Sequence, residues 1–284
     1  MWKMVENILN NIKWFFRVVK EHFNIKVNND ITLKDYKGLT VMTFNIRRDN
    51  LKDGKNNWQY RKDAIVKMIE DVSPDIICMQ EVMPHMAKYL KVQLSKYYDC
   101  KGLECFTGRE ITKSFCFVGE GLLTFYRKDR FDFIKKRKIR LFDGRKVNIR
   151  RACVVELFDN KTYKKYAVIN THFCHKSDEA RYNSYCKLWD YYCKNVDVTF
   201  NNVYICGDFN SEVGQSKSGI DLFNRNFTYN QPDKDGTINF FSKGVGKTID
   251  FIFSNEHYNA SYVVRNEYDG KKFLSDHWPV VNYY

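Results

Sequence analysis

Several features that define common protein classes are scarce or missing in this sequence. The 284 residues include only 4 prolines and 14 glycines, which excludes a collagen-like or low-complexity chain. No apolar run approaches the ~20 residues of a membrane span, and charged residues interrupt any signal-peptide core near the N-terminus. No two of the 9 cysteines form a CxxC motif, so a zinc ribbon or a thioredoxin-like site is unsupported.

The cysteines instead indicate a reducing compartment. Their number, 9, is odd, so they cannot all pair with one another. Cys78, Cys153 and Cys206 lie inside apolar runs, where a free cysteine behaves as a small hydrophobic residue. We therefore expect a cytoplasmic location.

Positive charge is what the chain has in excess. Lys and Arg number 47 against 34 Asp and Glu, which gives a formal net charge of +13. Such a surplus favours an anionic partner, which can be nucleic acid, an anionic membrane or a phosphorylated substrate. The composition is otherwise globular, with 44% hydrophobic residues, and the length fits one large domain or two small ones.

Most of the surplus lies in residues 127–151, the basic segment. It holds 12 basic and 3 acidic residues, and its densest run is Lys135-Lys136-Arg137-Lys138. One face of an alternating strand would collect much of this charge and would suit a phosphate backbone. We interpret the basic segment as a contact for DNA or RNA. A solvated face or a nuclear-import-like run is the alternative.

The first 37 residues differ from the rest of the chain. Apolar residues recur at helical spacing from Trp2 to Phe23, with Lys and Arg on the other side. Such an amphipathic helix can lie on an anionic membrane as a peripheral contact. Packing on its own domain or on another protein subunit is the interpretation that we favour. The polar stretch 26–37 is typical of a linker, so we divide the chain into residues 1–37 and a domain over 38–284.

Helical and extended patterns alternate after residue 38. Helices are predicted over Trp58–Asp71, His85–Tyr97 and Glu179–Asn195. Strands are predicted over Leu39–Asn45, Asp75–Gln80, Gly121–Tyr126, Phe131–Leu141, Ala152–Phe158, Tyr166–Thr171, Val203–Gly207, Thr248–Ser254 and Trp278–Tyr283. This order predicts sheets covered by helices, with parallel and antiparallel pairing left open.

Polar residues that suit phosphate chemistry accompany several of these strands. They are Asn45, Glu81, His172, Asp208 with Asn210, Asp250, and Asp276 with His277. Each alone is ordinary turn chemistry or a hydrogen-bonded structural histidine. As a set they are expected to converge on one site, because ligands bind at strand ends in α/β sheets.

The motifs MTFN, QEV, NTH, GDFN, IDFIF and SDHWPV follow one another in the sequence. Their order and spacing resemble the endonuclease/exonuclease/phosphatase superfamily, with its deoxyribonuclease I-like fold, from about Leu39 to the C-terminus. NIRRDN and NTHFCHKSDEAR are similar to a bacterial branch of metal-dependent hydrolases near the nocturnin-like deadenylases. The resemblance implies an α/β fold, a four-layered α/β sandwich with two packed mixed β-sheets flanked by helices.

The resemblance also implies roles for the matching residues. Glu81 matches the family's Mg²⁺ carboxylate, with Asn45 beside it, and hard oxygen ligands suit Mg²⁺ or Mn²⁺. Asp208 matches the residue that orients or deprotonates the attacking water. Asn210 matches the amide that holds the nucleophile or a phosphate oxygen.

Four further residues match site positions of the family. His172 and His277 match donors to phosphate oxygens, and Asp250 matches the carboxylate that orients His277. Asp276 matches a residue near the metal. A neighbouring carboxylate favours the charged form of imidazole, which suits a phosphate contact.

Some residues depart from the family's commonest pattern. Arg47 stands where many of its nucleases carry Asp, which indicates a phosphate contact or a salt bridge in place of a second metal carboxylate. His175 matches a histidine of the bacterial branch, and Arg181 either reaches the site or forms a structural ion pair. We take these three as candidate substrate-binding residues. Trp58 and Arg61 match the same branch and lie either beside the substrate or in the core.

The resemblance and the basic segment together predict a Mg²⁺-dependent phosphodiesterase that hydrolyses nucleic acid, as an endonuclease or exonuclease, by in-line attack of water. One alternative is a phosphatase or phosphodiesterase for a phospholipid or another small phosphoester at a membrane surface. A second alternative is a catalytically weak nucleic-acid-binding module. In the leading prediction, residues 38–284 form the catalytic domain.

Overall fold

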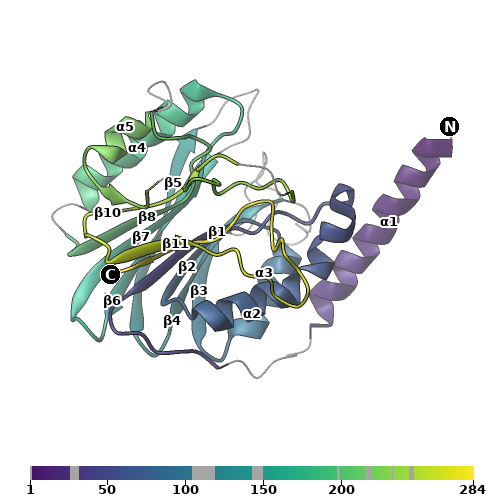
Figure 1. Cartoon of the computed structure of the whole chain (residues 1–284), viewed down its shortest axis with the longest axis horizontal. Helices are drawn as coiled ribbons and strands as arrows, with labels where there is room; N and C mark the ends of the chain where they lie inside the picture. Colours follow the sequence, from purple (N-terminus) through teal and green to yellow (C-terminus); the bar gives the residue numbers. More distant parts are fainter. Residues whose placement is uncertain are drawn as a thin grey trace.

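The computed structural model describes residues 2–25, 32–103, 119–142, 150–196, 199–214, 219–231, 233–242 and 246–284. Two six-stranded sheets pack face to face, and helices cover their outer faces (Figure 1). The predicted four-layered α/β sandwich with two mixed sheets is confirmed. Residues 26–31 of the predicted linker and residues 143–149 of the basic segment lie outside the described residues.

The first sheet has the strand order β11-β12-β1-β2-β4-β3. Its strands are β1 (Thr40–Asn45), β2 (Ile76–Val82), β3 (Tyr98–Leu103), β4 (Gly121–Arg127), β11 (Ala260–Val263) and β12 (Val280–Tyr283). β1 and β2 pair in parallel, and the other neighbours are antiparallel. Two helices cover this sheet, α2 (Lys62–Val72) and α3 (Pro84–Leu94) (Figure 1).

The second sheet has the strand order β5-β6-β7-β8-β10-β9. Its strands are β5 (Phe131–Phe142), β6 (Arg150–Asp159), β7 (Lys164–His172), β8 (Asn202–Asp208), β9 (Thr228–Tyr229) and β10 (Asp250–Ser254). Only β7 and β8 pair in parallel. The helices α4 (Asp178–Asn195) and α5 (Ile220–Asn224) lie on its outer face (Figure 1).

The interior between the sheets is apolar, except at the end where the candidate site residues gather. Cys78, Cys153 and Cys206 are buried there as free thiols, together with many branched and aromatic side chains. Strands buried on both faces appear in the sequence as continuous apolar runs, which explains why most of them could be predicted. Gln80 donates a hydrogen bond to Asn170 across the two sheets (2.9 Å). Asn170 in turn donates to the carbonyl of Leu123 (2.8 Å), so buried amides fix the sheets relative to one another.

Some predicted boundaries differ from the structure for local reasons. The helix predicted from Trp58 begins at Lys62, after the short 3₁₀ turns η1 (Leu51–Asn56) and η2 (Trp58–Tyr60). Trp58 and Arg61 are both fully buried, so they belong to the core. The guanidinium of Arg61 donates hydrogen bonds to several backbone carbonyls, among them that of Ile46 (2.9 Å).

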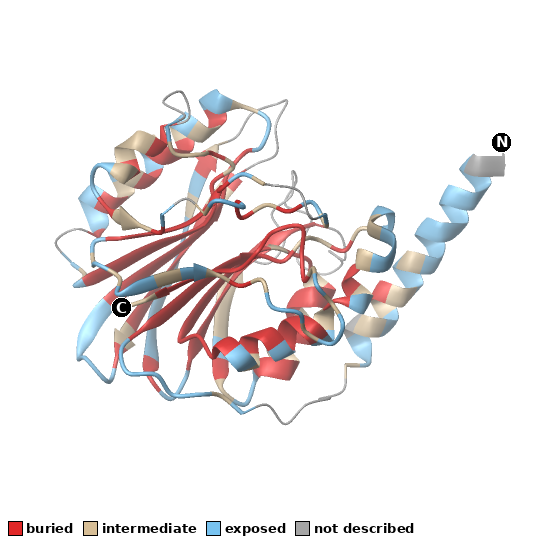
Figure 2. Cartoon of the chain, viewed as in Figure 1, coloured by how far each residue is buried: buried red, intermediate tan, exposed pale blue. Residues whose placement is uncertain are grey.

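The N-terminal residues form one long helix, α1 (Trp2–Phe23). Its C-terminal half lies beside α3 and the loop after β1, and its N-terminal half extends away from the sandwich (Figures 1 and 2). Among the described residues, no helix combines the length and the apolar character that a membrane crossing requires. The described part of the predicted linker is not free, because the Lys34 amide donates to Ser73 Oγ (2.8 Å).

Candidate active site

The predicted site residues gather where corresponding ends of the two sheets meet. Asn45 ends β1, Glu81 lies near the end of β2, His172 and Asp208 end β7 and β8, Asp250 begins β10, and His277 precedes β12. The strand register sets Asp208 opposite both His172 and Asp250. Residues distant in the sequence therefore meet because the fold brings strand ends together.

A histidine–aspartate pair forms the most enclosed part of the site. His277 Nδ1 lies 2.9 Å from Asp250 Oδ2, and both side chains are buried. The hydroxyl of Thr237 donates to the same carboxylate oxygen (2.6 Å). Burial alone would lower the pKa of His277, but the carboxylates of Asp250 and Asp208 outweigh it and raise that pKa to about 10. His277 therefore carries a positive charge at neutral pH.

Asp208 lies at the centre of the site. Its Oδ2 accepts a hydrogen bond from Asn45 Nδ2 (3.1 Å) and lies 3.4 Å from His172 Nε2 and 3.7 Å from His277 Nε2. Its Oδ1 accepts from the amide of Asn210 (2.9 Å). Burial raises the pKa of Asp208 to about 7, against the opposing effect of the His277 charge. The pKa of His172 is held well below its usual value by burial and by the charge of Arg150, so its imidazole is neutral.

Glu81 presents an ionised carboxylate. Its Oε1 accepts from Asn45 Nδ2 (3.2 Å), and its Oε2 accepts from the Arg48 amide (3.0 Å). Burial would raise the pKa of Glu81, but the Arg48 amide and the charge of His277 keep it below the usual value. Glu81, Arg47 and Asn210 all have positive backbone φ angles, of 61°, 55° and 50°. Such strain costs about 1–3 kcal/mol per residue and is concentrated at functional sites.

Arg47 forms ion pairs at the edge of the site. Its Nη1 lies 3.1 Å from Asp276 Oδ2, and its Nε donates to Asp53 (3.0 Å). Burial and the nearby Glu81 charge raise the pKa of Asp276, while His277 and Arg47 oppose that rise. Ser275 fixes this corner by donating to the carbonyl of Asn45 (2.6 Å). Arg47 therefore forms the salt bridge that was one of its two predicted roles, and its partner Asp276 is itself a candidate site residue.

The other two predicted substrate-binding residues contact groups outside the network around Asp208. Arg181 donates to the carbonyl of Cys174 (2.7 Å) and pairs with Asp178 on its own helix, so its charge is neutralised locally. His175 is exposed, and its Nδ1 lies 3.5 Å from Arg150 Nη2. Burial and Arg150 lower the pKa of His175.

Sequence reasoning missed Glu120 and Arg150. Arg150 is buried, and its Nη1 lies 3.8 Å from Glu120 Oε1. Burial and the Glu81 charge raise the pKa of Glu120. Glu120 directly precedes the predicted strand Gly121–Tyr126, and Arg150 lies in the basic segment two residues before another predicted strand, but no motif marks either as a site residue.

The basic segment leads to the same end of the second sheet. In the sheet register, Arg140 on the edge strand β5 lies opposite Arg151 on β6. The next residue of β6, Ala152, lies opposite Thr171 on β7, which directly precedes His172. Part of the charge is neutralised, since Arg137 donates to Glu156 (2.7 Å). The side chains of residues 133–138 are exposed along this edge.

The site offers several groups that could bind a divalent cation. Among the described residues, Asp208, Asp250 and His277 have potential ligand atoms within 4.8 Å of one another. A protonated imidazole cannot bind a metal, and His277 Nδ1 is engaged by Asp250, so we interpret this cluster as an ion-pair network. Glu81 fits better. Within the described part of the chain, each of its oxygens accepts one hydrogen bond, which leaves lone pairs for a cation, and Mg²⁺ typically uses one or two carboxylates plus water.

Comparisons with known proteins agree on the family. The model of the Endonuclease/Exonuclease/phosphatase family matches residues 42–277. The chain is 23% identical over 212 residues to the CCR4-Not complex 3'-5'-exoribonuclease subunit Ccr4 of Candida albicans, covering 60% of this chain. It is 23% identical over 241 residues to nocturnin of Xenopus laevis, covering 76% of this chain. The chain spans only 27% and 62% of the lengths of these two relatives.

Solved structures show the same architecture. An endonuclease/exonuclease/phosphatase from Bacteroides vulgatus superposes with a TM-score of 0.73 at 27% identity, covering 87% of this chain and 98% of that chain. A mannosyl-6-phosphatase from Bacteroides thetaiotaomicron superposes with a TM-score of 0.70 at 23% identity, covering 86% and 98%.

Proposed function

Because the chain belongs to the endonuclease/exonuclease/phosphatase family, we propose that it is a divalent-metal-dependent phosphodiesterase that hydrolyses nucleic acid. This is a family of phosphoester hydrolases, and one relative of the chain is by name a 3'-5'-exoribonuclease. The observation that carries the proposal is the buried network of Asp208, Asp250 and His277 beside the ionised Glu81. It combines fixed positive charge, for phosphate oxygens, with carboxylates placed to orient a water molecule.

Different side chains of the site serve different steps of hydrolysis. The Nε2–H of His277, held positive by Asp250, donates to a phosphate oxygen and offsets the charge that builds up there. His172 can donate a neutral hydrogen bond to the same group. Asp208 and the side-chain amide of Asn210 orient the attacking water, whose oxygen forms a new bond to phosphorus while the ester bond opposite breaks.

The proton balance of this reaction involves the central carboxylate and solvent. The proton of the attacking water passes to Asp208, and the departing oxygen takes a proton from solvent. Held by Glu81 with Asn45, Mg²⁺ or Mn²⁺ would supply positive charge to the phosphate and to the leaving group.

The exposed basic edge favours a polymeric substrate. Lys135 and Lys136 are exposed on β5, and the strand runs toward the end of the sheet that carries His172. A phosphodiester bound at the site could extend its neighbouring phosphates along this edge. A small phosphoester would gain nothing from a row of cations along a whole strand.

A substrate panel tests the proposal. We expect cleavage of labelled single-stranded RNA or DNA in Mg²⁺ or Mn²⁺, its loss in chelator, and its loss in Asp208→Ala. If the polymers stay intact while a small phosphomonoester or a phospholipid is hydrolysed, the substrate assignment is wrong and the catalytic chemistry stands. Tight binding of nucleic acid without turnover in either metal would make the chain a binding module.

A further inference from the structure

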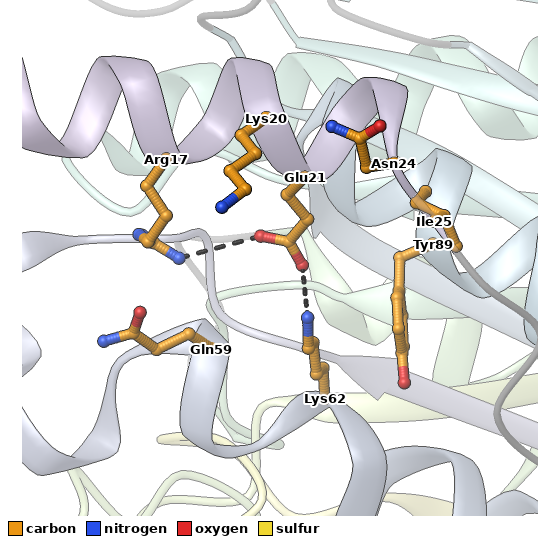
Figure 3. Close-up of a pocket in the computed structure, with 8 residues that line it drawn as sticks. All are labelled: Arg17, Lys20, Glu21, Asn24, Ile25, Gln59, Lys62 and Tyr89. Carbon is orange, nitrogen blue, oxygen red and sulfur yellow. Dashed lines mark hydrogen bonds and ion pairs between the residues drawn. The ribbon is translucent and has the colours of Figure 1, made fainter.

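Helix α1 docks on the domain through its polar side. Arg17 Nη2 donates to Asp49 Oδ2 (2.7 Å), in the loop after β1, and Glu21 accepts from Lys62 Nζ (2.7 Å) on α2. Figure 3 shows Arg17 and Glu21 pointing from the helix toward the domain, with Glu21 between Arg17 and Lys62. Val18 is fully buried in the same interface. Trp14 also packs against the core beneath α1, so the docked side combines charge pairs with apolar contacts.

The opposite side of α1 carries a row of exposed apolar residues, which we call the apolar stripe. It consists of Met4, Val5, Ile8, Leu9, Ile12 and Phe16, and each is between 46% and 68% exposed. Their spacing puts them on one side of a helix with 3.6 residues per turn. Figure 2 shows that α1 is exposed along most of its length beyond the sandwich. A contiguous apolar surface of this kind on a monomer marks a contact site.

We propose that the apolar stripe docks α1 on an anionic lipid surface. At 100° per residue, Lys13 and Lys20 lie along one margin of the stripe, next to Leu9 and Phe16, and Glu6 lies on the same margin. Both lysines are exposed, and Figure 3 shows Lys20 at the edge of the pocket between α1 and the domain. An apolar side with lysines along its margin is the pattern of a helix that lies in the membrane interface, with the apolar side among the acyl chains and the cations at the headgroups. This inference does not depend on the proposed function.

Charge decides between a lipid surface and a second copy of the chain. The chain has a formal net charge of +13, so two copies repel one another and an anionic bilayer attracts each. Packing of the stripe on its own domain is excluded by the geometry, because the polar side already occupies the interface.

Vesicle co-sedimentation of the full chain tests this docking. We expect binding to phosphatidylcholine vesicles that contain phosphatidylserine, and much weaker binding to phosphatidylcholine alone. The double substitution Leu9→Ser and Phe16→Ser should weaken binding by about tenfold or more, since it removes two large apolar side chains. The matched control is Tyr163→Ser with Tyr182→Ser, which removes two exposed aromatics outside α1 and should bind as wild type does.

The charge contribution is tested in the same assay. Lys13→Glu with Lys20→Glu should abolish the preference for phosphatidylserine while leaving the melting temperature unchanged, because both side chains are exposed. Light scattering without lipid should give a monomer. Equal sedimentation of wild type and the stripe variant would overturn the proposal. If the wild type is a dimer and the stripe variant is a monomer, the proposal is also overturned, because the stripe would then bind a second copy of the chain.

Discussion

The imidazole Nδ1 of His277 lies 2.9 Å from Oδ2 of Asp250, and neither side chain has appreciable contact with solvent. Asp250 pairs in the sheet with Asp208, so the two carboxylates and the imidazole are held by adjacent strands and by the segment before β12. Backbone pairing fixes their spacing, which is what a preorganised charge arrangement requires.

Replacing Asp250 by Asn should move the alkaline side of the pH–rate profile. The substitution keeps the shape of the side chain and removes a charge that raises the pKa of His277 to about 10. His277 then loses its proton at a lower pH, so kcat/KM should fall at neutral pH and decline at lower pH than in the wild type. The measurement is kcat/KM against pH for both proteins. Profiles that decline at the same pH would contradict the assigned role of Asp250.

Glu81→Gln should weaken the response to divalent cations. The amide keeps a similar size but lacks the negative charge that a hard cation prefers. Adding Mg²⁺ or Mn²⁺ should raise the melting temperature of the wild type and have much less effect on the variant. Glu179→Gln, an exposed change on α4, is the control and should respond as the wild type does. An unchanged response in Glu81→Gln would place the cation elsewhere.

Asp49→Asn should destabilise the fold at neutral pH by about 3 kcal/mol, because it breaks a buried pair with His85 (3.0 Å) and the contact with Arg17 (2.7 Å). Burial would raise the pKa of Asp49, but His85 and Arg17 lower it overall. The stabilisation is therefore present above the ordinary Asp pKa and is lost as pH falls through the lowered one.

Denaturant unfolding at several pH values measures this effect. The difference between wild type and Asp49→Asn should be largest at neutral pH and shrink in acid. Asp190→Asn, at an exposed pair with Lys194, should change stability by less than about 1 kcal/mol at every pH. A constant difference for Asp49→Asn across the acid range would show that its charge is not what stabilises the fold.

Removing charge from the edge strand should weaken binding of nucleic acid in a salt-dependent way. Lys135→Ala with Lys136→Ala is expected to reduce the slope of log K against log salt by about 2, with little regard to base sequence. Lys164→Ala with Lys165→Ala removes the same charge from the start of β7, at the far end of that strand from His172, and should leave the slope unchanged. Equal slopes for both variants would remove β5 from the binding surface.

Strands with continuous apolar runs or recognisable motifs could be predicted from the sequence. β2, β8 and β10 are buried on both faces, and their polar ends coincide with the residues that gather at the site. β3 was not predicted, because a strand such as Tyr98–Leu103 mixes charged, small and apolar residues. The last strand begins at Val280 and not at Trp278, since Pro279 has no amide hydrogen to donate to a sheet.

Residues whose role depends on tertiary contacts could not be found from sequence. Asp49, His85 and Arg17 meet only because a loop, α3 and α1 come together, and no motif links them. The helical spacing of α1 predicted two unlike sides. It did not predict that the polar side faces the domain, because charge pairs with Asp49 and Lys62 decide that orientation.

The most direct test of the account is hydrolysis of a labelled single-stranded oligonucleotide in Mg²⁺ by wild type, His277→Ala and the control His257→Ala. His257 is exposed and outside the site, so its variant should cleave as the wild type does. Loss of the positively charged imidazole should reduce kcat/KM by about 10²–10³ in His277→Ala. Equal cleavage by all three proteins would contradict the account, because the phosphate would then be hydrolysed without the charge that the fold buries at this site.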